Sequence, residues 1–430
     1  MLVSAALLAG VAATTLVPSA SSGAAGADDL RYNQIQVKGS HNSYHIEPPQ
    51  NLIDVFVRFQ ADAYLLQYTH DPLTTQLEDQ GVRQFELDLF ADVDGDLYAP
   101  DGVPGWKVLH VAQIDERSTC PKFTDCLAEM KAWSDANPTH VPIAVLLETK
   151  DDDDIPGGKV PDPITPALLH ELDDEIRSVL PEDQLLTPDF LRGVGRPGGA
   201  DGAGTVFPDP ESAVLGHGWP RLDDVRGRFI FVLNNDRDDY VDGDPTLAGR
   251  VAFPPSSPGN PDAAFIMRNN SISSFADIQA LVQAGYLVRS RADFPVETGL
   301  SGDPSSRDAA LASGAQLVSG DYLTPTDYER YDATFAARYG LPFDPDRPAY
   351  ETIVPGGNPA RCNPVNGPEG CTSEQVEDLD AEVPASSTTT TSTSAPGATS
   401  TTARATAGVA ATTGTSTAAV AVVAAPTFTG

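Results

Sequence analysis

Two histidines in this sequence have the chemistry and the positions of a catalytic pair. His41 follows an apolar run over residues 35–38, and His110 ends another at 107–111. One histidine beside a strand is more often structural, but two imidazoles with pKa values near neutrality can supply a general base and a general acid. We therefore expect both to face one pocket. His45 competes with His41 for the role, although it lies four residues further into the loop.

Acidic side chains near the same segments could hold a metal ion. Glu86 and Asp88 are two residues apart in a predicted strand, so their side chains point to the same face. Neighbouring carboxylates repel each other unless a cation or a proton lies between them. Together with Glu148 and the amide of Asn42 they form an oxygen-rich set that suits one Ca²⁺ better than Mg²⁺.

The alternative for these acids is a structural ion pair. Glu86 or Asp88 could pair with Arg83 or Lys150, which lie close in sequence to predicted strands two and four. We favour the metal site, because three carboxylates share this region with few bases.

Cationic side chains after later runs could receive a phosphate. Lys150, Arg268, Arg289 and Arg291 lie at or near predicted strand ends, and a planar guanidinium suits phosphate oxygens. Surface salt bridges are an equally good interpretation of any single one. Tyr322, with the acid before it, could offer an aromatic face and a hydrogen bond to a polyol ring.

Eight short apolar runs supply the elements that would position these residues. The runs cover residues 35–38, 82–89, 107–111, 141–149, 229–233, 264–268, 287–291 and 316–319. Amphipathic segments between several of them predict helices over 123–135, 165–180, 275–284 and 305–313.

Near-continuous apolar strands that alternate with helices predict a parallel sheet covered on both faces. Eight such strands over about 300 residues favour an α/β fold closed as a (β/α)8 TIM barrel. The barrel should be irregular, because the gap between the second and third runs is too short for a full helix. Titratable residues follow four consecutive runs, and active-site groups of such barrels lie at the C-terminal strand ends.

Composition narrows the function classes. The chain has 430 residues, 27 Lys+Arg against 61 Asp+Glu, a net charge of −34 and 40% hydrophobic residues. This acidity argues against a nucleic-acid partner, because such proteins neutralise phosphates with clustered basic residues. It also argues against docking on an anionic membrane by charge alone.

The two ends of the chain differ from its middle. Residues 1–27 carry no charge and predict a signal peptide, although the basic residues that usually start one are missing. Residues 384–430 form a Ser/Thr/Ala-rich, low-complexity tail that we expect to be disordered. The folded domain is therefore predicted over 28–383. We expect a secreted, extracellular protein, with retention at the cell wall or surface through the tail as an alternative.

Four cysteines fit an oxidising compartment. Cys120 and Cys126 flank one short loop, and Cys362 and Cys371 flank another. Two local disulfides are the simplest of the three possible pairings. A zinc site is the alternative, but it would favour tighter Cys spacing or neighbouring histidines.

Four sequence motifs together resemble the phosphatidylinositol-specific phospholipase C superfamily. They are residues 35–44, 84–88, 108–110 and 147–150, and the resemblance extends over about residues 30–355. The pattern is most similar to the secreted, calcium-dependent actinobacterial branch. The resemblance implies a distorted barrel of the PLC-like phosphodiesterase type and dependence on Ca²⁺. It also implies cleavage of phosphatidylinositol to diacylglycerol and an inositol (cyclic) phosphate.

By position in these motifs, the resemblance implies that His41 and His110 are the catalytic pair. It implies calcium ligands at Asn42, Glu86, Asp88 and Glu148. The expected partner is a phosphatidylinositol head group at a membrane surface, bound peripherally by a monomer.

A glycerophosphodiester phosphodiesterase on a related barrel is the alternative. That family typically has His-Arg-Gly after the first strand, whereas this sequence has His-Asn-Ser. The third interpretation of the sequence is a secreted cell-surface binding protein that is catalytically inactive.

Overall fold

A computed structural model describes residues 30–98, 102–152, 158–356 and 359–377. The predicted signal peptide and the tail lie outside the described residues. So do both predicted boundaries of the folded domain, residues 28 and 383.

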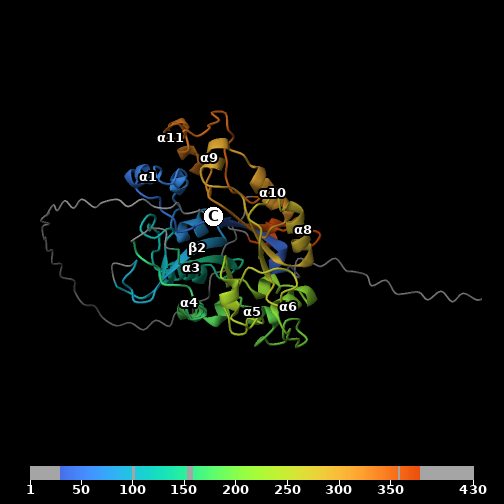
Figure 1. The fold of residues 1–430 in the computed structure, drawn as a ribbon. Helices are drawn as coiled ribbons and strands as arrows, with labels where there is room; N and C mark the ends of the chain where they lie inside the picture. Colours follow the sequence, from blue (N-terminus) through green and yellow to red (C-terminus); the bar gives the residue numbers. More distant parts are fainter. Residues whose placement is uncertain (1–29, 99–101, 153–157, 357–358, 378–430) are drawn as a thin grey trace, which may run out of the picture.

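Eight parallel strands form a nearly closed barrel (Figure 1). They run β6-β5-β4-β2-β1-β9-β8-β7 around it, and a parallel bridge between Pro255 and Phe265 links the two end strands. The strands are β1 Ile35–Ser40, β2 Gln84–Asp92, β4 Ile143–Lys150, β5 Phe229–Leu233, β6 Ala252–Phe253, β7 Phe265–Met267, β8 Leu287–Arg291 and β9 Leu317–Gly320. The predicted TIM barrel is confirmed.

One of the eight predicted strands is not part of the barrel. The run at 107–111 belongs to β3 (Gly105–Val108), which pairs antiparallel with the C-terminal half of β2. The barrel position assigned to it is filled by β4, and the missing eighth strand is the two-residue β6. Such a short strand gives little periodic signal. A further strand, β10 (Ala360–Cys362), pairs antiparallel with β1.

Helices cover the barrel, and four of them match the predicted amphipathic segments. In Figure 1, α1, α9 and α11 lie at the top of the view, and α5 and α6 lie at the bottom. The helices are α1 Gln50–Phe56, α2 Leu73–Glu78, α3 Phe123–Ala136, α4 Pro166–Val179, α5 Pro188–Arg192, α6 Pro210–Gly216, α7 Arg237–Val241, α8 Phe275–Ala284, α9 Glu297–Ser301, α10 Ser305–Ser313 and α11 Ala333–Tyr339.

Helix α4 shows how local sequence sets these elements. The Thr165 hydroxyl accepts a hydrogen bond from the backbone N–H of Leu168, and proline at the first helical position has the required φ. Leu169, Leu172 and Ile176 recur at helical spacing and are buried against the barrel.

Strand pleating separates the core from the site. Phe85 and Leu87 of β2 pack in a buried cluster that also holds Leu127 and Met130 of α3. The residues between them therefore point to the opposite face of the strand. That alternation sends the acidic side chains of β2 away from the helices.

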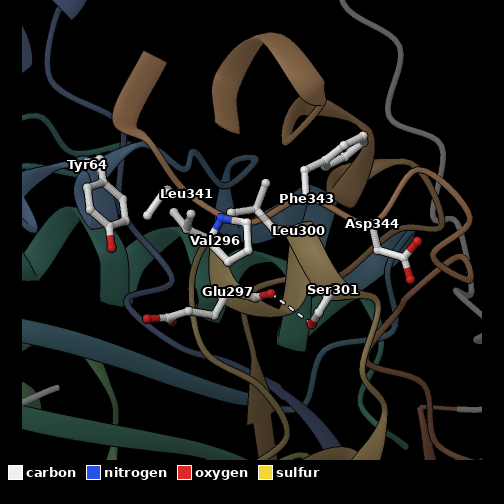
Figure 2. A pocket seen from close by; sticks show the side chains of 9 residues that line it. Tyr64, Val296, Glu297, Leu300, Ser301, Leu341, Phe343 and Asp344 are labelled. Atoms are coloured by element: carbon white, nitrogen blue, oxygen red, sulfur yellow. Dashed lines mark hydrogen bonds between the residues drawn. The ribbon is translucent and has the colours of Figure 1, made fainter. Parts of the chain in front are cut away.

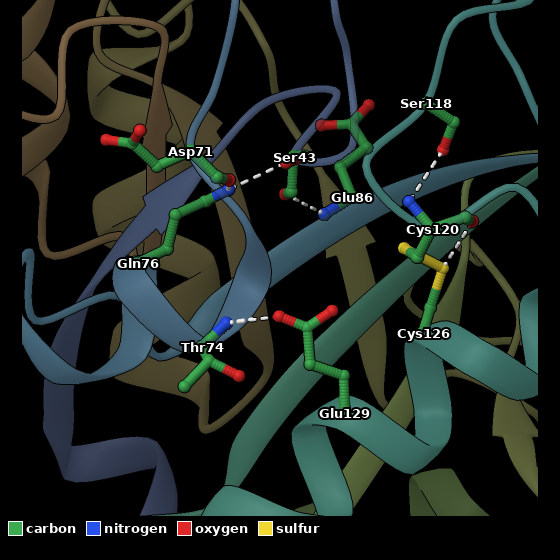
Figure 3. Close-up of a disulfide and its surroundings, with 9 residues drawn as sticks. All are labelled: Ser43, Asp71, Thr74, Gln76, Glu86, Ser118, Cys120, Cys126 and Glu129. Atoms are coloured by element: carbon green, nitrogen blue, oxygen red, sulfur yellow. Dashed lines mark hydrogen bonds between the residues drawn. A yellow bond between two sulfur atoms is a disulfide. The ribbon is translucent and has the colours of Figure 1, made fainter. Parts of the chain in front are cut away.

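Two disulfides tie loops to these elements. Cys120 is bonded to Cys126 in the first turn of α3 (Figure 3), and Cys362 of β10 is bonded to Cys371. Both predicted pairings are confirmed. Among the described residues, no helix is both long enough and apolar enough to cross a membrane.

Candidate active site

Polar residues from five strands meet at the C-terminal end of the barrel. The loop after β1 is fixed to β2 by two hydrogen bonds, from the Ser43 N–H to the Glu86 carbonyl (2.9 Å) and from the Glu86 N–H to the Ser43 hydroxyl (2.8 Å; Figure 3). This contact holds His41 and Asn42 beside the acids of the second strand. The residues at these ends are His41, Glu86, Asp88, Glu148, Lys150, Arg289, Arg291 and Asp321.

Three carboxylates form the acidic cluster, defined as Glu86, Asp88 and Glu148. One oxygen from each lies within 4.8 Å of the others. The register explains this, because Asp88 and Glu148 are direct partners in the parallel pairing of β2 with β4. Asn234 donates a hydrogen bond to the Glu148 carboxylate (2.6 Å) and orients it.

Cationic side chains also contact the acidic cluster. Lys150 Nζ lies 2.6 Å from an Asp88 oxygen and 3.9 Å from a Glu148 oxygen. Arg289 donates a hydrogen bond to Glu86. The ion pair considered as the structural alternative is therefore present for Lys150. Arg83 pairs instead with Glu377.

The residues of the acidic cluster nevertheless fit a hard cation. Asp88 is completely buried and neither carboxylate oxygen accepts a well-oriented hydrogen bond, although Lys150 is close. Burial raises the pKa of Asp88 to about 8, while the charge of Lys150 opposes this shift and repulsion from Glu148 and Glu86 adds to it. Unsatisfied buried carboxylate oxygens are the donors that Ca²⁺ prefers.

Asn42 lies in the loop after β1 that Ser43 fixes to β2 beside Glu86. Its backbone has φ of +44°, a left-handed conformation that asparagine tolerates better than most residues. Its side-chain N–H donates to the Tyr68 hydroxyl (2.9 Å), so the amide is oriented by that contact. The amide oxygen is the atom that suits a metal ligand.

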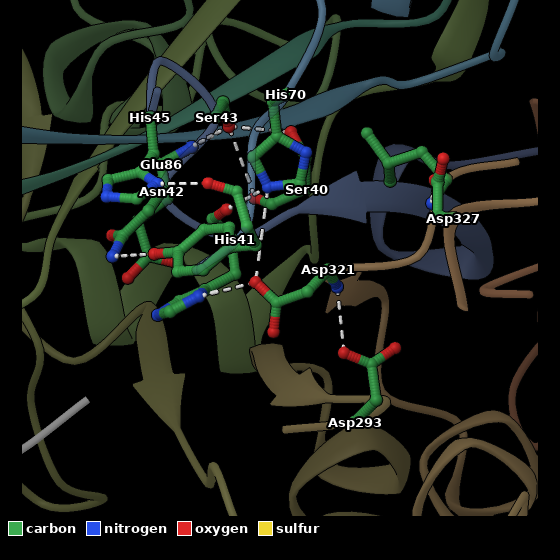
Figure 4. A network of polar contacts seen from close by, with 12 residues as sticks. Ser40, His41, Asn42, Ser43, His45, His70, Glu86, Asp293, Asp321 and Asp327 are labelled. Atoms are coloured by element: carbon green, nitrogen blue, oxygen red, sulfur yellow. Dashed lines mark hydrogen bonds and ion pairs between the residues drawn. The ribbon is translucent and has the colours of Figure 1, made fainter. Parts of the chain in front are cut away.

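His41 is anchored at one nitrogen by a carboxylate (Figure 4). His41 Nδ1 lies 2.9 Å from Asp321, which also accepts a hydrogen bond from Arg291 (2.9 Å). Burial lowers the pKa of His41 to about 3, and the charge of Arg291 adds to that effect while Asp321 opposes it. The imidazole is therefore neutral, with Nε2 as the nitrogen that can accept a proton.

His110 is anchored in the same way by a different carboxylate. It follows the antiparallel β3, and the N–H of the preceding Leu109 donates to the Asp88 carbonyl, which brings it beside β2. His110 Nδ1 lies 2.9 Å from Asp115. Burial lowers the pKa of His110, aided by the charge of Lys150 and opposed by Asp115.

A stack of rings joins the two histidines. The Tyr68 and His45 rings are stacked at 4.1 Å, with His110 5.6 Å beyond His45 and His41 6.5 Å from Tyr68. Tyr68 and His45 therefore connect the two histidines at this end of the barrel, and a shared catalytic role for His41 and His110 stays a prediction. His45 is completely buried, although its position in the loop suggested a place further out.

Two of the predicted substrate-binding residues are engaged elsewhere. The half-buried Arg268 guanidinium bonds Asp277 of α8. Tyr322 is 1% exposed, and its hydroxyl accepts a hydrogen bond from the Gly299 N–H (2.8 Å) among other tyrosines. The other two, Lys150 and Arg289, both contact the acidic cluster.

Sequence reasoning missed several partners of the histidines. Asp115 lies five residues after His110, and nothing marks it until the loop folds back. His70 Nε2–H donates a hydrogen bond to the backbone carbonyl of His41 (2.9 Å), because a carbonyl oxygen can only accept. Tyr68 and His70 follow no predicted strand, so position relative to a strand end could not reveal them.

A hollow of about 410 Å³ opens beside α9 (Figure 2). Its walls include Tyr64 of the short 3-10 helix Ala63–Leu66, Val296, Leu300 and Phe343. The carboxyl of Glu297 also lines it, and burial raises the pKa of that group, with Arg291 opposing the shift. Helix α9 follows the C-terminal end of β8, so this hollow lies at the same end of the barrel as the histidines and the acidic cluster.

An α/β barrel that carries two carboxylate-anchored histidines beside an oxygen-rich cluster is suited to general acid–base chemistry at its C-terminal end. The family model for Phosphoinositide phospholipase C, Ca²⁺-dependent, matches residues 30–364. The chain belongs to this family, and it is an enzyme of the phosphodiesterase class.

Solved structures of similar fold include calcium-dependent phosphatidylinositol-specific phospholipases C. The enzyme from Streptomyces antibioticus is 21% identical over 70% of this chain and 98% of its own, with a TM-score of 0.44. The enzyme from Pseudomonas sp. is 16% identical over 78% of this chain and 96% of its own, with a TM-score of 0.47. A comparison with curated proteins found no match.

Proposed function

We propose that this enzyme cleaves phosphatidylinositol at its glycerol–phosphate bond, releasing diacylglycerol and an inositol phosphate that forms first as the cyclic ester. The observation that carries the proposal is the pair of histidines, each bonded through Nδ1 to its own carboxylate, beside one acidic cluster. A carboxylate at Nδ1 fixes the tautomer of each neutral ring, with the proton on Nδ1.

In the proposed reaction, His41 is the general base. Its neutral Nε2 takes the proton of the inositol 2-hydroxyl, whose oxygen then attacks the neighbouring phosphorus. Because the nucleophile belongs to the substrate, most of the entropy cost of association is avoided. The imidazolium that forms is stabilised by Asp321, and the anionic phosphate of a bound substrate raises the pKa of this imidazole.

His110 is the proposed general acid. Its imidazolium gives a proton to the diacylglycerol oxygen as the phosphorus–oxygen bond breaks. Asp115 holds the ring by Nδ1 and stabilises the charged form before transfer. In a following step the same residues can run in reverse, with water opening the cyclic phosphate.

One Ca²⁺ is the proposed cofactor, held by Asn42, Glu86, Asp88 and Glu148. When bound, it would lower the pKa of the substrate hydroxyl and offset charge on the phosphate oxygens. Lys150 and Arg289 already contact these acids and are the proposed phosphate ligands. Arg268 and Tyr322 stay predictions from sequence.

The proposed substrate places the enzyme at a lipid surface, bound peripherally. Secretion remains a prediction, supported by two disulfides, which persist in oxidising compartments. A monomer is likewise a prediction.

A calcium titration with two substrates tests the proposal. Turnover should be measured on phosphatidylinositol in mixed micelles and on soluble glycerophosphoinositol, with chelator and then rising Ca²⁺. We expect calcium-dependent release of diacylglycerol from the lipid. Activity confined to the soluble diester would favour a glycerophosphodiester phosphodiesterase, and binding without turnover of either would refute an active site here.

A further inference from the structure

The hollow beside α9 has walls from three segments that follow neighbouring barrel strands. The lining side chains are Tyr64 in the segment after β1, Val296 and Leu300 in the segment after β8, and Leu341 and Phe343 in the segment after β9. These strands are neighbours in the order β1-β9-β8. Their C-terminal ends carry His41, Asp321 and Arg291 of the candidate active site. The same three strands therefore supply the histidine with its carboxylate and the walls of the hollow.

The polar groups that line the hollow are engaged within the protein (Figure 2). The Ser301 hydroxyl donates a hydrogen bond to the Glu297 carbonyl (2.9 Å). The Asp344 carboxylate accepts a hydrogen bond from the N–H of Asp346 (2.9 Å). Burial raises the pKa of the Glu297 carboxyl, as expected for a group next to apolar surface. The lining therefore offers an occupant mainly hydrocarbon and aromatic surface.

The backbone at Val296 is strained, which fixes one wall. Its φ of +68° and ψ of −57° place a β-branched residue in a conformation that such residues rarely adopt. The Glu297 N–H bonds the Pro295 carbonyl (2.8 Å) and closes a three-residue turn around it. The Val296 side chain is completely buried in a cluster with Leu300 and Tyr322. Strain of this kind persists where the surrounding packing enforces it, and it clusters at ligand sites.

The charge of the protein favours an apolar contact with lipid. The net charge of −34 opposes electrostatic attachment to phosphatidylinositol, which is itself anionic. Exposed apolar side chains lie on two of the segments that form the hollow. Val55 and Phe59 precede Tyr64 in the segment after β1, and Phe294 precedes the strained turn after β8. These segments therefore present apolar side chains to solvent as well as to the hollow.

We propose that the hollow binds one acyl chain of the phosphatidylinositol substrate, an inference that rests on the proposed function. The head group lies at the strand ends beside His41, and the chain, joined to the phosphate through glycerol, occupies the hollow. Its volume of about 410 Å³ lies within the range of about 300–1,000 Å³ that is typical of small-molecule sites. Each methylene that leaves water for the hollow strengthens binding by up to about fourfold.

The first test does not depend on turnover. Methyl-labelled protein is titrated with dihexanoylphosphatidylcholine below its critical micelle concentration, so that the probe is monomeric. Nuclear Overhauser contacts should join the acyl protons of the probe to the methyl groups of Val296, Leu300 and Leu341. Leu215 of α6 is the control, because it is exposed at the opposite side of the barrel from α9 (Figure 1). If the three methyl groups show no such contacts, the proposal is wrong.

The second test is the dependence of turnover on chain length. Monomeric dibutanoyl- and dihexanoylphosphatidylinositol are compared, and kcat/KM should be up to about fifteenfold higher for the longer substrate, about fourfold for each methylene of the bound chain. Leu300→Trp and Leu341→Trp fill the hollow, so this ratio should fall towards one. Leu215→Trp is the matched control and should keep the parental ratio. Because the ratio is taken within each variant, a smaller folded fraction does not change it.

The outcomes separate this inference from the proposed function. Acyl contacts at the hollow without turnover of either phosphatidylinositol would refute the proposed function and retain a hydrocarbon site. Calcium-dependent turnover with equal kcat/KM for both chain lengths would retain the proposed function and overturn the chain site, as would a parental ratio in both hollow-filling variants. A second copy of the protein seated on the hollow would appear in sedimentation as a dimer that Leu341→Trp dissociates, and that result would also overturn the proposal.

Discussion

Replacing Asp321 with asparagine should remove most of the catalytic rate while leaving calcium binding intact. Asp321 lies 2.9 Å from His41 Nδ1 and stabilises the imidazolium that forms when His41 takes a proton. Asparagine keeps an acceptor oxygen but carries no charge. An ion pair with about 4 Å between its charges is worth about 4 kcal/mol at an effective dielectric constant of about 20. We therefore expect kcat to fall by roughly a thousandfold.

The same change also affects stability, so a matched variant is needed. Arg291 donates to Asp321, and breaking a buried ion pair from one side costs about 3–5 kcal/mol. Asp173→Asn is the control, because Asp173 is a buried aspartate that pairs with Arg250 (3.0 Å) in a different part of the barrel wall. It should lose comparable stability and keep its kcat.

The assay is turnover of phosphatidylinositol in mixed micelles at saturating Ca²⁺, at a temperature where circular dichroism shows each variant folded. Calcium affinity is measured separately by calorimetry. If folded Asp321→Asn retained more than a tenth of the parent kcat, the carboxylate would not be coupled to His41. Equal losses in Asp321→Asn and Asp173→Asn would indicate a stability effect alone.

Three further outcomes are expected. Glu148→Gln should raise the Ca²⁺ concentration for half-maximal activity by about ten- to a hundredfold, and an unchanged value would remove Glu148 from the ligand set. His110→Ala should lower kcat by about 10²–10⁴, and near-normal turnover with Ca²⁺ present would refute its role as acid. Burial lowers the pKa of His140 to about 4 in the folded protein. As the pH falls from 6.5 to 4, His140 therefore becomes protonated in the unfolded chain before it does in the folded one. The free energy of unfolding should fall over that interval by up to about 3 kcal/mol. Acid denaturation of His140→Gln should show a smaller slope in that interval.

The barrel could be predicted because its signal is local. Apolar strands and amphipathic helices repeat along the chain, and α8 and α10 have the predicted bounds. The error at β3 has a physical cause. Antiparallel and parallel strands carry the same short apolar pattern, so residues 107–111 could not be told from a barrel strand.

The acidic cluster was also accessible from sequence, because strand geometry fixes it. Side chains two apart share a face, and parallel neighbours in register bring their ends together, so Asp88 meets Glu148. The pairing of Lys150 with Asp88 was foreseen only as an alternative to the metal. Deciding which cation approaches a carboxylate needs the packing around it.

The sequence by itself determined the fold class and the residue types of the candidate site, and it indicated two local disulfides as the simplest pairing. Tertiary structure alone decided which carboxylate each histidine uses, because one partner is 280 residues away and the other is reached only when its loop folds back. Asp321 lies in the segment after β9, far from His41 in the sequence, and Asp115 reaches His110 and His45 through a turn with no periodic pattern. Hydrogen bonds of this kind depend on distances between segments, and spacing along the chain does not encode those distances.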